Sequence, residues 1–202
     1  KLNLITDNSS LNIVAKLNEF SPLSKENYTD IEKAIFDVNA DIDSINTNDL
    51  LKFIVLPFNN NQVAHIKLVA NGTNSELVIQ QLNANIGNRH IDLTGSLFNF
   101  MNDNITYSAN IENSIVAKQD LINLIKEDLS IIPDVNYAEI KKIQANGSSK
   151  HINANLDLIT DAGGVIGIVN FQFEPDYKYL ADLEFRKLDL EKITSTSDLA
   201  SN

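Results

Sequence analysis

The sequence of 202 residues contains no cysteine and only two arginines, Arg89 and Arg186. The absence of cysteine excludes disulfides, thiolate nucleophiles and cysteine metal sites. Scarce arginine and a formal net charge of -11 argue against a nucleic-acid surface, because phosphate binding needs clustered positive charge. The same acidity disfavours adsorption to anionic lipid headgroups. Any contact with lipid is therefore expected to be apolar.

Long hydrophobic runs are also missing. The densest apolar stretches, FIVLPF at 53–58 and GGVIGIVNF at 163–171, are much shorter than the roughly 20 residues of a membrane-spanning helix. We therefore expect no transmembrane segment in this chain. The chain begins at Lys1 with neither an initiator methionine nor a signal-peptide pattern, which indicates a piece of a longer protein. Any anchor or targeting signal is expected to lie outside it.

Three segments alternate apolar and mostly polar side chains. A period of two is typical of a strand in a sheet with one apolar and one wet face. The apolar members of the three copies are Phe36, Val38, Ala40 and Ile42; Ile105, Tyr107, Ala109 and Ile111; and Tyr177, Tyr179, Ala181 and Leu183. Alignment of the alanines at 40, 109 and 181 indicates a repeat with a period of about 70 residues.

Short amphipathic helices are predicted after the first two of these strands. The apolar residues of NTNDLLKFI at 46–54 and of AKQDLINLI at 117–125 follow the i, i+3, i+4 spacing of a helix face. Pro57 and Pro133 follow as stop signals. The third copy continues into the similar segment LDLEKI at 188–193.

Further strands and turns fill the rest of each unit. Turn signals lie at Gly87-Asn88 and at 161–164, each between alternating runs. The motif Ala70-Asn71-Gly72 recurs as Ala145-Asn146-Gly147. The predicted organisation is one continuous window of a repeat array, with the tail of a preceding unit at 1–35, repeats at 36–104 and 105–176, and the start of a further repeat at 177–202.

This organisation predicts a mainly β fold. Repeat units stack because one unit cannot cover its own apolar face, and the result is elongated. The helices are too few and too short to cover so many strands. We therefore expect an elongated, curved antiparallel β-sheet with a hydrophobic groove, built from repeats of several strands plus one short helix.

Three stretches resemble the TamB branch of the AsmA-like family in its Bacteroidota form. They are ANIENS with AKQDLINLIKEDL and IPDV, then IQANGSSKHINANLDLITDAGGVIGIVNFQF at 143–173, and YKYLADLEFRKLDLEKI at 177–193. The resemblance implies a periplasmic protein, anchored in the inner membrane by a segment outside this chain, whose taco-shaped sheet conducts phospholipids toward the outer membrane. It also implies a role in outer-membrane protein assembly with an Omp85-type barrel, through regions outside this chain.

The twelve apolar residues of the three strands are the candidate groove lining. A groove lined by them could solvate phospholipid acyl chains, since each buried methylene contributes about 0.8 kcal/mol. On the alternation alone, ordinary sheet core packed against an opposite wall is the favoured interpretation. The family resemblance is what favours the groove.

Signs of catalysis or of metal binding are weak. The three histidines, His65, His90 and His151, sit beside isoleucines in strand patterns without ligand spacing, so no metal site and no cofactor are expected. The chain has no GxSxG, phosphate loop or HExxH, and we do not expect an enzyme. The alternative function is a structural or adhesive repeat of an exported surface protein, which would predict a closed sandwich with ligand contacts on exposed loops.

Overall fold

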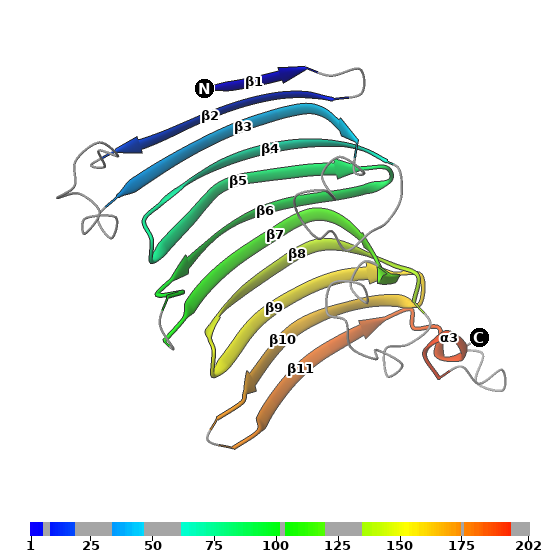
Figure 1. Cartoon of the computed structure of the whole chain (residues 1–202). Helices are drawn as coiled ribbons and strands as arrows, with labels where there is room; N and C mark the ends of the chain where they lie inside the picture. The colour runs from blue at the N-terminus through cyan, green and yellow to red at the C-terminus, as the bar shows by residue number, and fades with distance from the viewer. Residues whose placement is uncertain are drawn as a thin grey trace.

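A computed structural model describes residues 1–5, 9–18, 34–46, 62–101, 104–119, 135–174 and 176–194. All eleven strands of this part of the chain belong to one antiparallel sheet, and each strand pairs with the next in sequence order. The sheet is curved and unclosed, with β1 at one edge and β11 at the other (Figure 1). The expected fold class, a mainly β chain forming an elongated, curved antiparallel sheet, is confirmed.

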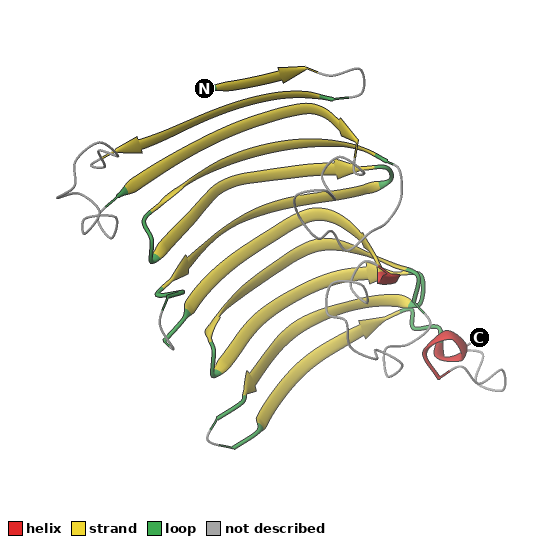
Figure 2. Cartoon of the chain, in the orientation of Figure 1, coloured by secondary structure: helices red, strands yellow, loops and turns green. Residues whose placement is uncertain are grey.

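The strands are close to uniform in length, apart from the short β1. Their bounds are β1 Leu2–Ile5, β2 Ser10–Asn18, β3 Ile35–Asn46, β4 Val63–Gly72, β5 Glu76–Ile86, β6 Arg89–Phe98, β7 Thr106–Ala117, β8 Tyr137–Ser148, β9 His151–Thr160, β10 Gly163–Gln172 and β11 Lys178–Arg186. One short helix, α3 Leu190–Thr194, follows β11 (Figure 2).

The predicted turns are present. Gly87-Asn88 joins β5 to β6, with Gly87 at a φ of 61° that suits glycine, and Asp161-Ala162 joins β9 to β10. Helix α3 begins within the LDLEKI segment of the third copy. The helices predicted at 46–54 and at 117–125 lie largely outside the described residues. For the second, residues 118–119 are helical, and the description stops at Gln119.

Several strands carry β-bulges, which bend a sheet locally. Register shifts occur between Ile42 and Ile45 of β3, between Ile79 and Leu82 of β5, and between Ile140 and Lys142 of β8. The bulge region of β7 includes Asn113, a non-glycine residue with a φ of 46°. Across these bulges the apolar residues stand three positions apart instead of two, yet they remain on the same face, because Ile79 and Leu82, for example, pair with Gly95 and Leu93, which are two positions apart on β6.

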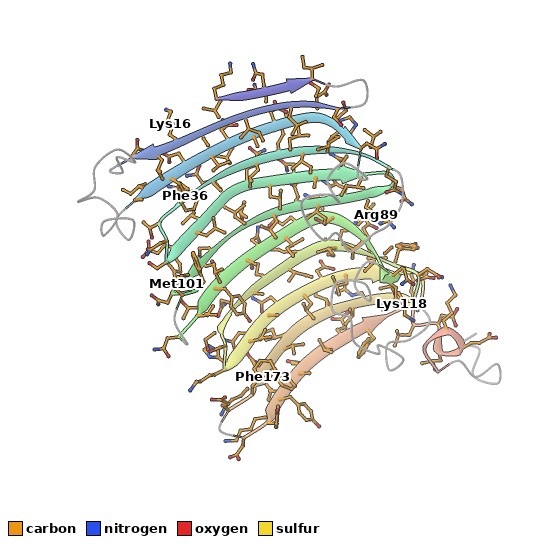
Figure 3. The ribbon with its side chains drawn as sticks, in the orientation of Figure 1. Lys16, Phe36, Arg89, Met101, Lys118 and Phe173 are labelled. Atoms are coloured by element: carbon orange, nitrogen blue, oxygen red, sulfur yellow. The ribbon has the colours of Figure 1, made fainter. Side chains whose placement is uncertain are left out.

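The two ends of the strands form two rims that differ in their connections. One rim carries the β2–β3, β4–β5, β6–β7, β8–β9 and β10–β11 connections, and we call it the hairpin rim. The other carries the tight β5–β6 and β9–β10 turns, the long connections after β3 and β7, and α3; we call it the helix rim. Figure 3 shows Phe36, Met101 and Phe173 along the hairpin rim and Arg89 and Lys118 along the helix rim.

A four-strand pattern recurs along the sheet. Apart from Ile35, the first residue of β3, strands β3 to β6 lie within the predicted repeat 36–104, and β7 to β10 lie within the predicted repeat 105–176, followed by β11. In both sets, a strand rich in apolar alternation is followed by one that ends in Ala-Asn-Gly or Ala-Asn-Gly-Ser, and then by a hairpin pair. β4 and β8 are therefore equivalent strands, and β3, β7 and β11 hold equivalent places.

Candidate functional site: an apolar face across the sheet

Apolar side chains continue in straight rows across the strands on one face of the sheet. Residues that pair directly between antiparallel strands point to the same face, so the register identifies each row. The row nearest the hairpin rim, which we call the rim row, consists of Leu17, Phe36, Gly72, Leu77, Leu97, Tyr107, Gly147, Ile152, Phe171 and Tyr179.

Two further rows run parallel to the rim row. The middle row consists of Ala15, Val38, Ala70, Ile79, Gly95, Ala109, Ala145, Ala154, Val169 and Ala181. The inner row consists of Ile13, Ala40, Leu68, Leu82, Leu93, Ile111, Ile143, Leu156, Gly167 and Leu183. No member of the three rows is charged. The apolar face therefore runs without interruption from β2 to β11.

Ten of the twelve candidate lining residues fall on this face. Phe36, Tyr107 and Tyr179 belong to the rim row; Val38, Ala109 and Ala181 to the middle row; and Ala40, Ile111 and Leu183 to the inner row. Ile42 pairs with Ile66, one step nearer the helix rim. Ile105 and Tyr177 directly precede β7 and β11. The three copies, on β3, β7 and β11, thus contribute to the same rows of one continuous face, and they do not form separate patches.

The register corrects the alignment of the three alanines. Ala109 and Ala181 share the middle row, but the first copy contributes Val38 there, and Ala40 lies in the inner row with Ile111 and Leu183. The prediction that alanine occupies the equivalent position in each copy is therefore wrong for Ala40. Sequence alternation has a period of two, so a shift of two residues leaves the pattern unchanged and only strand pairing reveals it.

Most of the apolar face comes from strands that the sequence did not assign to the lining. Leu68, Leu82, Leu93, Ile143 and Leu156 complete the inner row between the predicted positions. Their signal was present, because the runs containing them alternate in the sequence. Assigning them to the face required the register, which the bulges in β5 and β8 shift.

Burial is uneven over the apolar face. Close to the helix rim, Ile45, Ala64 and Ile86 form a small core with Leu11, Ile42 and Ile66 packed against it. Towards the hairpin rim and the β11 edge, large side chains are open, with Leu17 51% exposed, Tyr179 81% and Phe185 54%. Among the described elements, the substantial contacts are between neighbouring strands, so no second described layer packs on this face.

Two aromatic residues of the rim row lie over glycines of the next strand. A Cβ at Gly72 would stand 2.9 Å from Cζ of Phe36, and a Cβ at Gly147 would stand 2.8 Å from Oη of Tyr107. Phe36 and Tyr107 are the equivalent residues of the two repeats, so the arrangement is itself repeated. Partial burial against these neighbours raises the pKa of the Tyr107 hydroxyl above its ordinary value, because desolvation disfavours the phenolate.

The opposite face is predominantly polar. Ser96 and Ser108 share a hydrogen bond of 2.8 Å between their Oγ atoms, and Asn153 Nδ2 donates to Asn146 Oδ1 at 3.4 Å. The amphipathic sheet therefore has a wet face opposite the apolar rows. An exception lies near β11, where Ile168 and Leu180 are 47% and 64% exposed on the wet face.

The histidines and acidic residues do not converge on a site. Nδ1 of His90 lies 2.7 Å from Asn85 Oδ1, Nδ1 of His151 lies 2.8 Å from Ser148 Oγ, and His65 faces the exposed Asp43 at 4.0 Å. Within the described ranges, no group of three or more His, Asp or Glu side chains is placed to hold a metal ion.

At the helix rim, Asp161 links three parts of the fold. Its carboxylate accepts hydrogen bonds from the backbone N and Nδ2 of Asn136 at 3.0 and 2.8 Å, and it faces Nζ of Lys192 at 3.5 Å. Desolvation alone would raise the pKa of Asp161, but the bonds from Asn136 and the charge of Lys192 outweigh it, so the pKa lies below its ordinary value. Asp161 thereby holds α3 against the β9–β10 turn.

A hollow of about 490 Å³ lies beside this rim at the β9–β11 end of the sheet. Its lining includes Ile159, Ile166 and Arg186, whose guanidinium donates to Glu184 at 2.8 Å.

In the part of the chain that the structure describes, no helix is long and apolar enough to span a membrane. Comparisons of this chain with protein-family models, curated proteins and solved structures found no match.

Proposed function

We propose that this chain is a periplasmic segment of a TamB/AsmA-like protein whose apolar face binds phospholipid acyl chains on their way between the inner and outer membranes. The observation that supports the proposal is the continuity of the three apolar rows across the boundary between β6 and β7, where one predicted repeat gives way to the next. A ligand on this face would find similar side chains in each unit. Movement along it would need no chemical step.

The energetics of apolar burial are sufficient to bind an acyl chain. Each methylene transferred from water to an apolar surface contributes about 0.8 kcal/mol, and several neighbouring methylenes therefore suffice for reversible binding. The middle row consists mostly of small residues, the rows on either side mostly of large ones, and none of the three carries a charge. The headgroup would remain in water beyond the hairpin rim.

The role in outer-membrane protein assembly, the inner-membrane anchor and the Omp85-type barrel belong to the same proposal. They rest on the family resemblance and concern regions outside this chain. The alternative of an adhesive module predicted a closed sandwich, whereas all eleven strands of the described residues lie in one unclosed sheet.

The test uses two neighbouring positions on β8 that point to opposite faces. The purified chain is incubated with vesicles of phosphatidylethanolamine and phosphatidylglycerol, re-isolated, and its bound lipid is measured by mass spectrometry. Ile143→Glu places a charge in the inner row and is expected to lower bound lipid at least about tenfold, since a charge among acyl chains is costly. Gln144→Glu, an exposed change on the wet face, is the matched control and should bind lipid normally.

If both variants retain lipid equally, or if the unmodified chain re-isolates without lipid, the proposal is wrong. Far-ultraviolet circular dichroism of each variant establishes that the sheet is intact. A variant that loses its sheet is replaced by Leu156→Gln, which lies in the same row one strand further along.

A further inference from the structure

Polar atoms are almost absent from the side chains of the three apolar rows. The exceptions are the hydroxyl groups of Tyr107 and Tyr179, and both residues belong to the rim row. Every other member of the rows is a glycine or carries a hydrocarbon side chain. Of the three rows, the rim row is therefore the one whose side chains can form a hydrogen bond with a ligand.

The hydroxyl of Tyr107 lies over the sheet and not beyond its end. Tyr107 is the second residue of β7, and its Oη would stand 2.8 Å from a Cβ at Gly147 of the next strand. Tyr107 is partly buried there, and burial raises the pKa of its hydroxyl. Among the described residues, no hydrogen-bond partner reaches this hydroxyl. A donor held against an apolar surface without a partner is costly, so an acceptor from a ligand would stabilise it.

The surroundings of the hydroxyl favour a neutral acceptor. No member of the three rows is charged, and the chain as a whole carries a formal net charge of -11. A phosphate drawn in among the rows would lose water without gaining a cation, which is costly. The carbonyl oxygen of an ester is a neutral acceptor, and in a phospholipid it lies where the acyl chains meet the glycerol.

The width of the apolar face fits an acyl chain that extends from this point along the strands. Tyr107 in the rim row and Ile111 in the inner row are four residues apart on β7, which corresponds to about 13 Å at roughly 3.3 Å per residue. The acyl region of one leaflet is about 15 Å thick, half of a hydrocarbon core of about 30 Å. At the hairpin rim the face is open, with Leu17 51% exposed, whereas Ile45, Ala64 and Ile86 form a core close to the helix rim. The polar end of the lipid therefore belongs at the hairpin rim.

We infer that the Tyr107 hydroxyl donates a hydrogen bond to an ester carbonyl of the bound phospholipid. This inference rests on the proposed function and adds the orientation of the ligand, with the glycerol at the rim row and the acyl chains directed toward the inner row. Phe36 holds the equivalent place in the first repeat and has no hydroxyl. The two repeats therefore differ: the first holds only the acyl chains, and the second also recognises the ester.

The experiment compares lipids that differ only in the acceptor. The purified chain is incubated with vesicles in which phosphatidylethanolamine and phosphatidylglycerol are each present in equal amounts as the diacyl form and as the dialkyl ether form, with chains of the same length. The ether form lacks the carbonyl oxygens. After re-isolation of the chain, mass spectrometry measures the ratio of diacyl to dialkyl lipid that it retains. Tyr177 and Tyr179, which are exposed, are replaced by phenylalanine in every chain compared, so that Tyr107 supplies the hydroxyl of the apolar face.

The chain with Tyr107 is expected to retain the diacyl form in excess. One neutral hydrogen bond changes an affinity by about two- to tenfold, and lipid bound away from Tyr107 dilutes the preference, so the expected ratio is at least about twofold. Tyr107→Phe should bring the ratio to that of the vesicles while the chain still retains lipid. Tyr137→Phe is the matched control, because it removes the same hydroxyl from the wet face at the helix rim and should leave the preference unchanged.

The results separate this inference from the proposed function. If the chain retains lipid with no preference for the diacyl form, or if Tyr107→Phe keeps the preference, the inference is wrong and lipid binding stands. If the chain retains neither form, the proposed function fails and the inference fails with it. A loss of preference in Tyr137→Phe equal to that in Tyr107→Phe would also overturn the inference, because the effect would not be specific to the rim row. Far-ultraviolet circular dichroism establishes that each variant keeps its sheet.

Discussion

The glycine at the end of β8 gives the sharpest test of the packing between repeat strands. In Gly147→Ala, the new Cβ would stand 2.8 Å from Oη of Tyr107 and 3.1 Å from Cα of Ile152, and it would overlap the carbonyl oxygen of His151. The tyrosine can move, but the carbonyl belongs to His151, the first residue of β9. The backbone of the hairpin must therefore shift, and β9 loses part of its register with β8.

The size of the effect follows from two opposing contributions. Overpacking costs about 1–3 kcal/mol, whereas replacing a strand glycine by alanine otherwise gains about 0.5–1 kcal/mol. The net expected loss is about 1–2 kcal/mol. For a chain of this size, each kcal/mol lowers Tm by about 2–4 °C, so Tm should fall by roughly 2–8 °C. Gly72→Ala, the equivalent change in the first repeat, should behave alike because its Cβ would meet Phe36 and the Glu76 carbonyl.

Gly164→Ala is the matched control. The nearest atom to a Cβ at Gly164 is 3.5 Å away, which is ordinary contact, and Gly164 has no positive φ. This variant should be as stable as the unmodified chain or slightly more stable. Thermal unfolding and urea denaturation followed by circular dichroism measure all three. A Gly147→Ala variant as stable as Gly164→Ala would refute the close packing of the rim-row aromatic residues over glycine.

Two further predictions concern polar contacts. Ser114→Ala should lower the free energy of unfolding in urea by about 1–3 kcal/mol, because the buried hydroxyl accepts from the amide of Asp92 at 2.8 Å and donates to the carbonyl of Glu112; an unchanged midpoint would contradict this. The folded pKa of Asp161 is depressed, so its stabilisation is present above the ordinary aspartate pKa and lost as pH falls through the folded value. The stability difference between the unmodified chain and Asp161→Asn should accordingly be largest near neutral pH and vanish in acid, whereas a difference independent of pH would argue against the bond to Lys192.

Local signals in the sequence were sufficient to locate the strands and tight turns. Alternation placed the three principal strands, and Gly87-Asn88 marked a hairpin because glycine adopts positive φ without strain. These features depend on a few neighbouring residues. The curved antiparallel sheet followed from the number of strands and the shortage of helices.

Strand pairing could not be read from the same signals. Whether Val38 or Ala40 stands in the row of Ala109 depends on bulges in intervening strands, such as the one between Ile79 and Leu82. The apolar run of β10 also concealed its two faces, since Ile168 points to the wet face and Val169 to the apolar face. The extent of the apolar face therefore emerged only from the register.

The most direct test of the central claim is site-specific photo-crosslinking in cells, in the protein to which this segment belongs. The probe is placed at Ile111 in the inner row and, as control, at Gln144, which is exposed on the wet face of the next strand. Our account predicts phospholipid adducts at Ile111 and none at Gln144. Adducts to protein alone at Ile111, or equal lipid adducts at both positions, would contradict it.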